Sequence, residues 1–442
     1  MKILIISHGH PTFSPGGGEI AAYELFKGLT RAGHDASFLA RVGSPHTIAH
    51  NGTRFQTVPH TPSEYLYFSD GIDHFLQSGL TIAEGPNLHN LRTLLKELKP
   101  DVIHFQHSAH LGLEWLRICR ECIPGAAIVY TLHEYLLICN RDGQMLRTYD
   151  SQPCDRATPS ACHRCFPDIS VQSFGMRRLF VQAHLENVDA FVAPSNFLLR
   201  KYVEWGIEES RIHFIANGRT LQSEAPPRPG DDDLSGRLSG KSENGKQARR
   251  SHFGFFGQIN PFKGVLVLLD AMARLASRRD AGHIQLFLHG SHLELQSREF
   301  QERFAAALGM CKDNVTVLPP YRAEELPGLM RNIDWVVVPS IWYENSPLVI
   351  QEAYMHRRPV ICSGIGGMAE KVIDGQTGLH FRVGSSEDLA RTLLRAAAAP
   401  ELWKACRAHI PAVFTVEQSI DAHMELYLKC QRLRQRALAT TA

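Results

Sequence analysis

Apolar and polar positions alternate along the chain in a way that predicts short buried strands separated by amphipathic helices. In the first half, strand-like runs alternate with helix-like segments. These runs read KILIIS, ASFLARV, DVIHFQH, AIVYTL, AFVAPS and RIHFIANG. Such alternation is typical of a parallel sheet with crossover helices. We therefore expect a doubly wound domain over residues 1–219.

The alternation stops between Leu221 and Arg250, where the sequence is rich in Pro, Gly, Ser and charged residues. A stretch almost without apolar residues is typical of a flexible linker. The pattern then resumes with HFGFFGQ, IQLFLHG, VTVLPP, WVVVPS and RPVICS, each followed by a helix-like segment. We expect a linker over residues 220–250 and a second doubly wound domain over residues 251–414.

Residues 415–442 predict one amphipathic helix. The stretch TVEQ near their start has the capping-box pattern that begins many helices. The apolar residues after it share one helical face, namely Ile420, Met424, Tyr427 and Leu428. We expect this face to dock on another apolar surface.

Length and charge indicate how many domains the chain has and which classes of ligand it can bind. The 442 residues exceed what one core usually supports, which agrees with two domains. A net charge of +2 gives no electrostatic case for nucleic acid, so an anion must be held locally. MKILIIS lacks the longer apolar core of a signal peptide, and no run approaches the roughly 20 apolar residues of a spanning helix. We expect a cytoplasmic protein with at most peripheral membrane contact; the sequence does not indicate an oligomeric state.

The glycines of PGGGE lie just before an amphipathic helix that stops at Gly33. Free N–H groups and the positive end of a helix dipole suit a phosphate, and glycine lets the phosphate come close. Gly17 and Gly18 are therefore candidates for binding a ligand phosphate. A glycine-rich turn without a ligand is the alternative.

A dinucleotide-binding loop is a second alternative, because Gly16, Gly18 and Ala21 satisfy the pattern G-x-G-x-x-A. Two observations argue against an NADP-dependent dehydrogenase. Eight residues, HGHPTFSP, separate the first strand from the glycines, and Arg41 stands where an acidic residue would end the second strand.

Two glutamates flank a predicted helix start in the stretch ENSPLVIQE. Asn345 or Ser346 fits the N-cap position, and Pro347 fits the first helical position, where proline's missing N–H is not needed. Glu344 then stands in the loop before the helix, and Glu352 lies inside the helix. The helix start therefore falls between the two carboxylates.

The first helical residues, Leu348 and Val349, would offer free N–H groups to an anion. Glu344 would stand beside that anion, and Glu352 would lie further along. This arrangement suits one ligand that carries phosphates in its middle.

Two Rossmann-like domains, the GGGE loop, the GQINPFKG segment and the Glu-x7-Glu spacing together resemble family 4 of the retaining glycosyltransferases. The similarity covers nearly the whole chain except the linker and a cysteine-rich loop. It implies an α/β fold of the GT-B type, in which two doubly wound domains face each other across a cleft. It also implies transfer of a sugar from a nucleoside-diphosphate donor to an acceptor hydroxyl, in polysaccharide or glycolipid assembly.

In this resemblance, the first domain binds the carbohydrate or lipid-linked acceptor and the second domain binds the nucleotide sugar. The helix of residues 415–442 would cross back to the first domain. No side chain stands out as a covalent nucleophile, so the leaving phosphate oxygen would help to deprotonate the acceptor on the same face. No catalytic metal is expected.

The resemblance gives roles to five positions. Glu344 would bind hydroxyls of the donor sugar, and Glu352 would bind the ribose, because a carboxylate accepts hydrogen bonds from two adjacent hydroxyls. Lys263, in the loop after the first strand of the second domain, would neutralise the leaving diphosphate. Gln258 stands where the family more often has arginine and brings no charge. His133, at the end of a first-domain strand, would contact the donor sugar.

A glycine turn, SGIGGMAEK, also matches the family, with Gly366, Gly367 and Glu370 after a strand; a simple turn is the alternative. His107 ends the preceding first-domain strand and is a weaker candidate than His133. The expected catalytic residues are Glu344, Lys263 and His133. The expected donor-binding residues are Gly17, Gly18, Gln258, Asn345, Ser346, Leu348, Val349, Glu352, Gly366, Gly367 and Glu370.

A polar stretch, residues 139–165, contains four cysteines: Cys139, Cys154, Cys162 and Cys165. A loop this long inside a compact domain needs something to hold it. Four thiolates, two of them in C-x2-C spacing, suit a tetrahedral structural zinc. Unpaired thiols are the alternative, and an iron–sulfur cluster is a third. Cys119 and Cys122 also form a C-x2-C pair, but their segment is helix-like and predicts packing.

Two other functions remain as alternatives to sugar transfer. One is a nucleotide-sugar epimerase, or a hydrolase that uses the paired carboxylates as acid and base. Glycosidase carboxylates flank one bond within roughly 10 Å, whereas here a helix start lies between them. The other is a nonenzymatic nucleotide-sugar-binding scaffold. The motifs do not select a sugar, a base or an acceptor.

Overall fold

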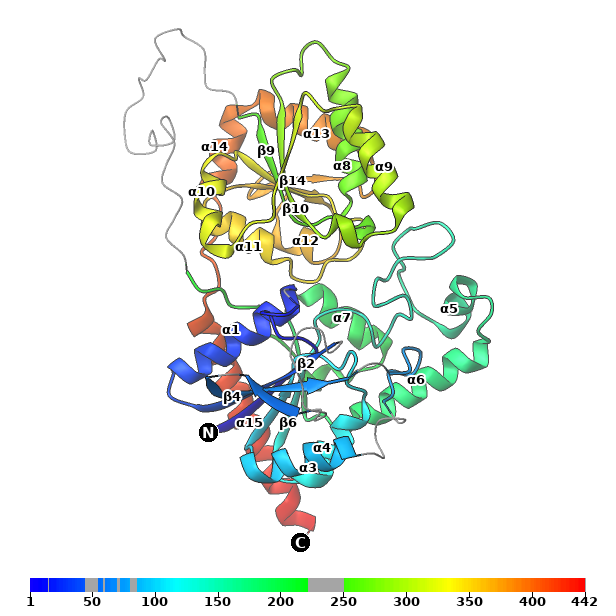
Figure 1. Ribbon diagram of the computed structural model, residues 1–442, viewed down its shortest axis with the longest axis vertical. Coiled ribbons are helices and arrows are strands. Elements are labelled where there is room, and N and C mark those ends of the chain that lie inside the picture. Colours follow the sequence, from blue (N-terminus) through cyan, green and yellow to red (C-terminus); the bar gives the residue numbers. More distant parts are fainter. Residues whose placement is uncertain are drawn as a thin grey trace. The chain divides into compact units, whose positions relative to one another are not determined.

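The computed structural model describes residues 1–14, 16–43, 55–58, 60–69, 72–79, 86–221 and 250–441. The chain divides into two compact units, each built on its own sheet (Figure 1). The first unit comprises Met1–Thr220 and Phe414–Ala442, and the second comprises Leu221–Val413. Apart from its ends, the expected linker 220–250 lies outside the described residues.

The first unit has an eight-stranded sheet in the order β3-β4-β2-β1-β5-β6-β7-β8. Neighbouring strands are parallel except β3 and β4. The strands are β1 (Lys2–Ser7), β2 (Asp35–Val42), β3 (Phe55–Val58), β4 (Thr61–Phe68), β5 (Val102–Phe105), β6 (Ala127–Thr131), β7 (Ala190–Ala193) and β8 (Ile212–Phe214). Strands β5, β6 and β7 are buried along their whole length, as expected for parallel strands covered on both faces.

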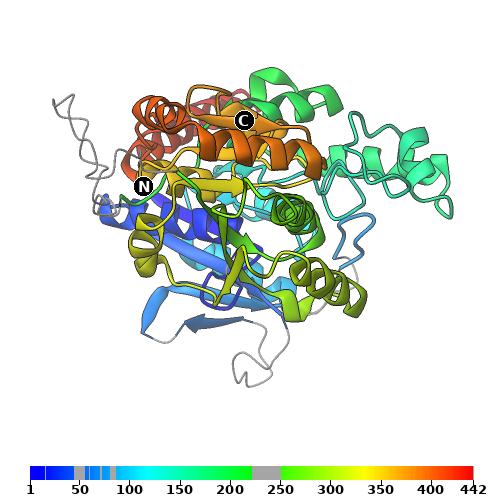
Figure 2. The ribbon, with the colours of Figure 1, turned by 90° about the horizontal axis from the view of Figure 1, so that it is seen from above.

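The helices of the first unit connect these strands. They are α1 (Gly17–Arg31), α3 (Pro86–Leu98), α4 (Glu114–Cys122), α5 (Pro159–Cys165), α6 (Val171–Leu185), α7 (Asn196–Trp205), the 3-10 turn η1 (Glu209–Arg211) and α15 (Val416–Thr441). Figures 1 and 2 show α5 and the segment before it projecting from the body of this unit. Cys119 is buried on α4, as the packing interpretation expects.

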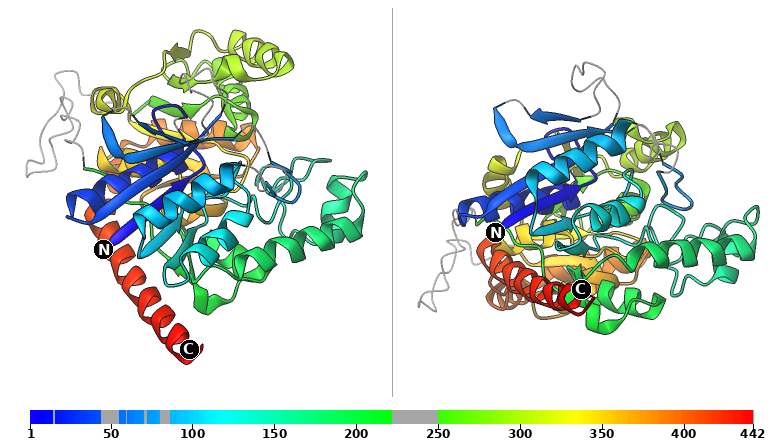
Figure 3. Two further views of the ribbon diagram at one scale, coloured as in Figure 1. Left: turned by 60° about the horizontal axis from the view of Figure 1, so that its bottom comes forward. Right: turned by 90° about the horizontal axis from the view of Figure 1, so that it is seen from below.

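The last helix, α15, lies beside α1 in the first unit (Figure 3). The capping box forms, because the Thr415 N–H donates to Gln418 Oε1 at 2.9 Å and the Gln418 N–H donates to Thr415 Oγ1 at 3.3 Å. Ile420 and Tyr427 are buried in the core of the unit. The predicted face is wrong at Leu428, which is 44% exposed, because the buried stripe turns toward Leu426 and Cys430 instead.

The second unit has a six-stranded sheet in the order β11-β10-β9-β12-β13-β14, with all neighbours parallel. Its strands are β9 (His252–Gln258), β10 (Gln285–Ser291), β11 (Val315–Leu318), β12 (Trp335–Val338), β13 (Val360–Ser363) and β14 (Gly378–Phe381). Its helices are α8 (Val265–Ala276), α9 (Arg298–Gly309), α10 (Leu326–Arg331), α11 (Leu348–Met355), α12 (Gly366–Lys371), α13 (Ser386–Ala398) and α14 (Pro400–Ala408), with 3-10 turns η2 (Pro261–Lys263), η3 (Leu293–Leu295) and η4 (Ala323–Glu325).

Both units are therefore α/β layers around a mostly or wholly parallel sheet, which confirms the predicted fold class. In such sheets, ligands bind outside the carboxyl ends of the strands. Across the described ranges, no helix is long and apolar enough to cross a membrane.

Candidate active site

The loop after β9 is shaped to hold Lys263 at the carboxyl end of the sheet. Asn260 Oδ1 accepts hydrogen bonds from the backbone N–H groups of Phe262 and Lys263, both at 3.0 Å, and so caps the turn η2. Gly264 follows with a φ of 70°, and a Cβ there would collide with the Pro339 carbonyl oxygen. Glycine is therefore required both by the left-handed backbone and by the close contact.

The loop after β12 lies against this turn, because β9 and β12 are parallel neighbours in the sheet. The Ile341 N–H donates to the Phe262 carbonyl at 2.9 Å and ties the two loops together. Lys263 Nζ then lies 2.6 Å from Glu344 Oε1. The structure thus brings two of the three predicted catalytic residues into direct contact.

Three side chains converge on one oxygen of Glu344. Ser340 Oγ donates to Oε1 at 2.7 Å, Trp342 Nε1 donates to it at 3.0 Å, and Lys263 is the third donor. The Glu344 side chain is 7% exposed, so these bonds fix its orientation. None of the three uses Oε2. Sequence reasoning missed Ser340 and Trp342, although both stand in the strand-end loop that carries the glutamate.

The start of α11 differs from the prediction by one residue. The N-cap is Pro347, with φ −61° and ψ 120°, and no side chain among the described residues caps the helix. Neither Asn345 nor Ser346 is therefore the N-cap, because the extended backbone continues through the proline. Leu348 and Val349 do occupy the first two helical positions.

The hydroxyl of Ser346 is buried beside this helix start. In the part of the chain that the structure describes, its Oγ has no hydrogen-bond partner. A buried hydroxyl without a partner costs free energy, so such a group suggests a contact that a ligand completes.

Two other predicted donor-binding residues lie at the edges of this region. Gln258 is the last residue of β9 and is partly exposed. Glu352 lies on the second turn of α11 and is also partly exposed, between the buried Gln351 and Ala353. Their ligand contacts remain predictions.

The paired glycines of α12 serve the chain's own backbone. A Cβ at Gly367 would collide with the Asn345 carbonyl oxygen, and the Gly367 N–H donates to the Glu344 carbonyl at 2.7 Å. Gly366 has a φ of 59°. The close approach expected of a ligand at Gly367 is thus made by residues 344–345. A donor contact at Gly366, Gly367 or Glu370 remains a prediction.

In the first unit, the glycine loop leads into α1 as predicted, with Gly16 at the N-cap. Glu19, in the first turn, points back toward the glycines, and a Cβ at Gly16 would collide with its carboxylate. His8 Nε2 lies 3.1 Å from Glu19 Oε1. Burial alone would raise the pKa of Glu19, but His8 outweighs it and the pKa is lowered.

A carboxylate of the chain therefore occupies the helix N-terminus at which the sequence predicts a ligand phosphate. The helix dipole already stabilises this negative charge. Sequence reasoning missed Glu19 and its partner His8. The phosphate contacts of Gly17 and Gly18 remain predictions.

His133 lies close to this helix start. A Cβ at Gly18 would lie 3.6 Å from the His133 ring, so this glycine leaves space beside the imidazole. His133 Nε2 lies 2.8 Å from Gln106 Oε1. Burial, with smaller effects of His107 and His8, lowers the pKa of His133 to about 3, so the ring is neutral near pH 7.

His107 and Glu134 form a neighbouring pair, with His107 Nε2 2.7 Å from Glu134 Oε1. The Ala109 N–H donates to His107 Nδ1 at 2.8 Å, so a neutral His107 carries its proton on Nε2 and donates it to Glu134. Burial raises the pKa of Glu134 to about 8. The weaker candidate, His107, is thus engaged with a carboxylate of the chain.

The four loop cysteines are free thiols, each partly buried. Burial, followed by the effects of Cys139 and Cys154 and, more weakly, Cys165, raises the pKa of Cys162 to about 12. Among the described residues, no three side chains of His, Cys, Asp or Glu are placed to hold a metal ion. The zinc site remains a prediction.

Each of the two units matches a model of a known protein family. The family model described as glycosyltransferase family 4 matches residues 15–223, and that described as glycosyl transferases group 1 matches residues 250–399. The D-inositol 3-phosphate glycosyltransferase of Rhodococcus opacus is 32% identical over 238 residues, which are 53% of this chain and 50% of that protein. The protein of the same name from Pseudarthrobacter chlorophenolicus is 27% identical over 85% of this chain and 82% of its own length. The chain spans about half the length of the first of these curated relatives.

Solved structures show the same architecture. Sucrose-phosphate synthase from Thermosynechococcus elongatus has a TM-score of 0.69 at 19% identity, covering 100% of both chains. The Anabaena protein HepE in complex with UDP has a TM-score of 0.66 at 17% identity, covering 97% of this chain and 100% of its own. The fold is thus of the GT-B type. The two family models match consecutive parts of the chain, one in each unit, so the chain is similar to glycosyltransferases of family 4 and group 1 over most of its length.

Proposed function

We propose that the protein transfers a sugar from a nucleoside-diphosphate donor to an acceptor hydroxyl with retention of the anomeric configuration. The observation that carries this proposal is the 2.6 Å contact between Lys263 Nζ and Glu344 Oε1. It joins a cation and a carboxylate at the carboxyl ends of neighbouring parallel strands, where doubly wound sheets bind ligands.

The donor's diphosphate would lie at the start of α11. The N–H groups of Leu348 and Val349 have no partner inside the helix, and the dipole adds positive potential. The buried Ser346 hydroxyl supplies a further contact. Because Gln258 is uncharged, Lys263 carries the charge neutralisation, and its side chain, 30% exposed, has room to reach a phosphate.

The two carboxylates would bind the donor's sugar and its ribose. Glu344 is held by Ser340 and Trp342 through Oε1, so Oε2 can accept hydrogen bonds from adjacent sugar hydroxyls. Glu352, one turn into α11, would accept hydrogen bonds from the ribose hydroxyls.

The acceptor would bind to the first unit. His133, whose imidazole is neutral, would contact a hydroxyl of the donor sugar. In the proposed mechanism, no carboxylate acts as a covalent nucleophile. The bond between the anomeric carbon and the diphosphate oxygen breaks, and the acceptor oxygen bonds to the same face of that carbon. The departing phosphate oxygen takes the proton of the acceptor hydroxyl, while Lys263 compensates the negative charge that develops on the diphosphate.

The test is a donor panel with the full chain, using uridine, guanosine and adenosine diphosphate sugars, with released nucleoside diphosphate as the readout. Inositol 3-phosphate belongs among the acceptors, because relatives carry it in their names, and UDP-glucose among the donors, because the Anabaena protein has been crystallised with it. NMR of the product would show whether the anomeric configuration is kept.

Variants separate the proposal from its alternatives. Lys263→Ala and Glu344→Ala should each lower transfer on the order of a hundredfold. Lys312→Ala, an exposed lysine of the same unit, is the matched control. Interconversion of donor sugars without an acceptor would favour an epimerase, and no response to any donor would favour a scaffold.

We also propose that Cys139, Cys154, Cys162 and Cys165 bind a structural zinc. The support is their number and spacing, with Cys162 and Cys165 in C-x2-C spacing, in a long polar segment that needs something to hold it. Binding would require the thiols to draw together from the positions that the structure gives them, since these positions do not form a metal site.

A further inference from the structure

A buried chain of hydrogen bonds runs from α15 toward His133. Its centre is His104, which is 0% exposed. The Tyr427 hydroxyl lies 2.6 Å from His104 Nδ1, and Thr131 Oγ1 lies 2.7 Å from His104 Nε2. Burial holds the pKa of His104 well below its ordinary value, so the ring is neutral. Both ring nitrogens therefore have hydroxyl partners.

Gln106 lies against the face of this imidazole. Its amide nitrogen is 3.3 Å from His104 Nδ1 and 3.2 Å from His104 Nε2. An atom nearly equidistant from both nitrogens at this range cannot lie in the ring plane, because it would collide with the carbon between them. The amide nitrogen therefore lies over the face of the ring, beside its π system.

This contact decides which way the amide points. An N–H group is attracted to the negative face of an aromatic ring, whereas a carbonyl oxygen is repelled by it. The nitrogen of Gln106 thus belongs on the side of His104, and the oxygen belongs on the other side. That oxygen lies 2.8 Å from His133 Nε2.

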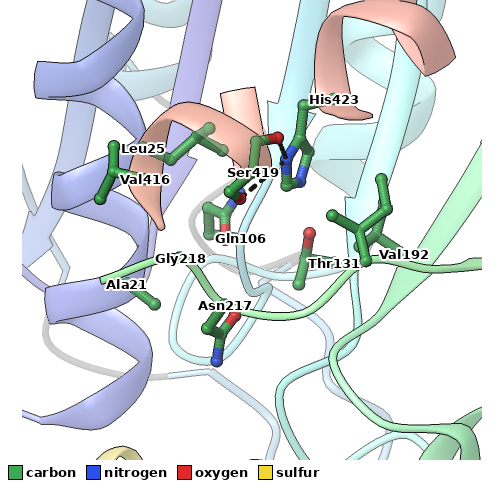
Figure 4. Close-up of a pocket in the computed structure, with 11 residues that line it drawn as sticks. Ala21, Leu25, Gln106, Thr131, Val192, Asn217, Gly218, Val416, Ser419 and His423 are labelled. Carbon is green, nitrogen blue, oxygen red and sulfur yellow. Dashed lines mark hydrogen bonds between the residues drawn. The ribbon is translucent and has the colours of Figure 1, made fainter. Parts of the chain in front are cut away.

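Gln106 has little freedom to turn away from this position. It is 3% exposed and borders a cavity of about 20 Å³ together with Thr131, Ser419 and His423 (Figure 4). A cavity of this size holds about one water molecule. His423 is fixed in the cavity wall, because its Nδ1 lies 2.7 Å from the Ser419 carbonyl oxygen and donates to it.

We propose that Gln106 is a positioning residue that fixes His133 as the tautomer protonated on Nε2. An amide oxygen only accepts hydrogen bonds, so His133 Nε2 must donate. Nδ1 of that tautomer carries a lone pair and can only accept hydrogen bonds. Any contact of His133 with a sugar substrate rests on the proposed function, whereas the tautomer does not.

In this proposal, the last helix, α15, also helps to position His133. Tyr427 of α15 holds His104, His104 orients Gln106, and Gln106 orients His133. These contacts join residues that are 323 positions apart in the sequence.

The test measures the tautomer directly, in the full chain labelled with ¹⁵N-histidine. Two-bond ¹H–¹⁵N correlation spectra distinguish the two tautomers, and the spectrum of His133→Gln identifies the signals of His133. Wild type should show protonation on Nε2, and Gln106→Met should show a mixture. Gln172→Met, an exposed glutamine on α6, is the matched control and should leave the signals of His133 unchanged.

Two results would overturn the proposal: protonation of His133 on Nδ1 in the wild type, or an unchanged tautomer in a folded Gln106→Met. In the transfer assay, Gln106→Met should lower kcat about tenfold or more with a smaller change in KM. A wild-type chain without transferase activity would contradict the proposed function alone, because the spectra need no substrate.

Discussion

Lys263 Nζ lies 2.6 Å from Glu344 Oε1, although 81 residues separate the two along the chain. Each residue stands in a loop after a strand, and the two strands, β9 and β12, are neighbours. Ser340 and Trp342 donate to the same carboxylate oxygen. The pair is therefore a cation next to a carboxylate that the chain holds in place. The role of each residue can be tested by its own substitution.

Replacing Glu344 should affect stability and transfer differently. Glu344→Ala removes the acceptor of the buried Ser340 hydroxyl, which should lower the free energy of unfolding by about 1–3 kcal/mol. Glu344→Gln keeps an acceptor oxygen and should unfold closer to wild type, yet transfer should fall about a hundredfold in both. Urea unfolding and diphosphate release measure the two effects. Full transfer in a folded Glu344→Gln would show that the charge is not needed.

Gly367→Ala should destabilise the second unit by about 1–3 kcal/mol. The added methyl group would collide with the Asn345 carbonyl oxygen and force apart the loops that carry Glu344 and α12. Gly282→Ala is the matched control, because nothing lies within 4 Å of a Cβ at that position. Thermal unfolding of the two variants would decide this, and equal melting temperatures would contradict the prediction.

The free energy of unfolding should decrease between about pH 4.5 and pH 8 through Glu134. Burial raises its pKa from 4.5 to about 8 in the folded chain. In this window the folded chain holds a proton that the unfolded chain releases, so rising pH favours unfolding; below it both states are protonated. Glu134→Gln, which imitates the neutral acid, should flatten the dependence. Glu425→Gln, exposed on α15, should leave it as in wild type.

Metal analysis of the purified chain should find about one zinc per molecule if the cysteine segment binds metal. Replacing all four cysteines by serine should abolish this zinc, and a chelator should lower the melting temperature of wild type but not of the variant. Cys406→Ser changes a buried cysteine of the other unit and is the control for thiol loss. Wild-type protein without zinc would favour unpaired thiols.

Most strands could be predicted from the sequence, because the periods of two and 3.6 residues are local properties. The prediction missed β3, β4 and β14. The same reasoning placed His133 at a strand end, Lys263 in the loop after β9 and Glu344 in the loop before α11. It failed at the start of α11, where Pro347 stays in the extended backbone that precedes the helix. It also missed Glu19, which fills the helix N-terminus that the glycines leave open.

By itself, the sequence determined two doubly wound sheets, the start of α11 to within one residue, and the loop or strand-end positions of Lys263, Glu344 and His133. Only the tertiary structure decided which of them meet: Lys263 with Glu344, Gly367 with Asn345, and the path from Tyr427 to His133. The physical reason is that hydrophobic periodicity depends on residues a few positions apart. Contacts between loops depend on strand order and on packing between distant segments, which no local pattern encodes.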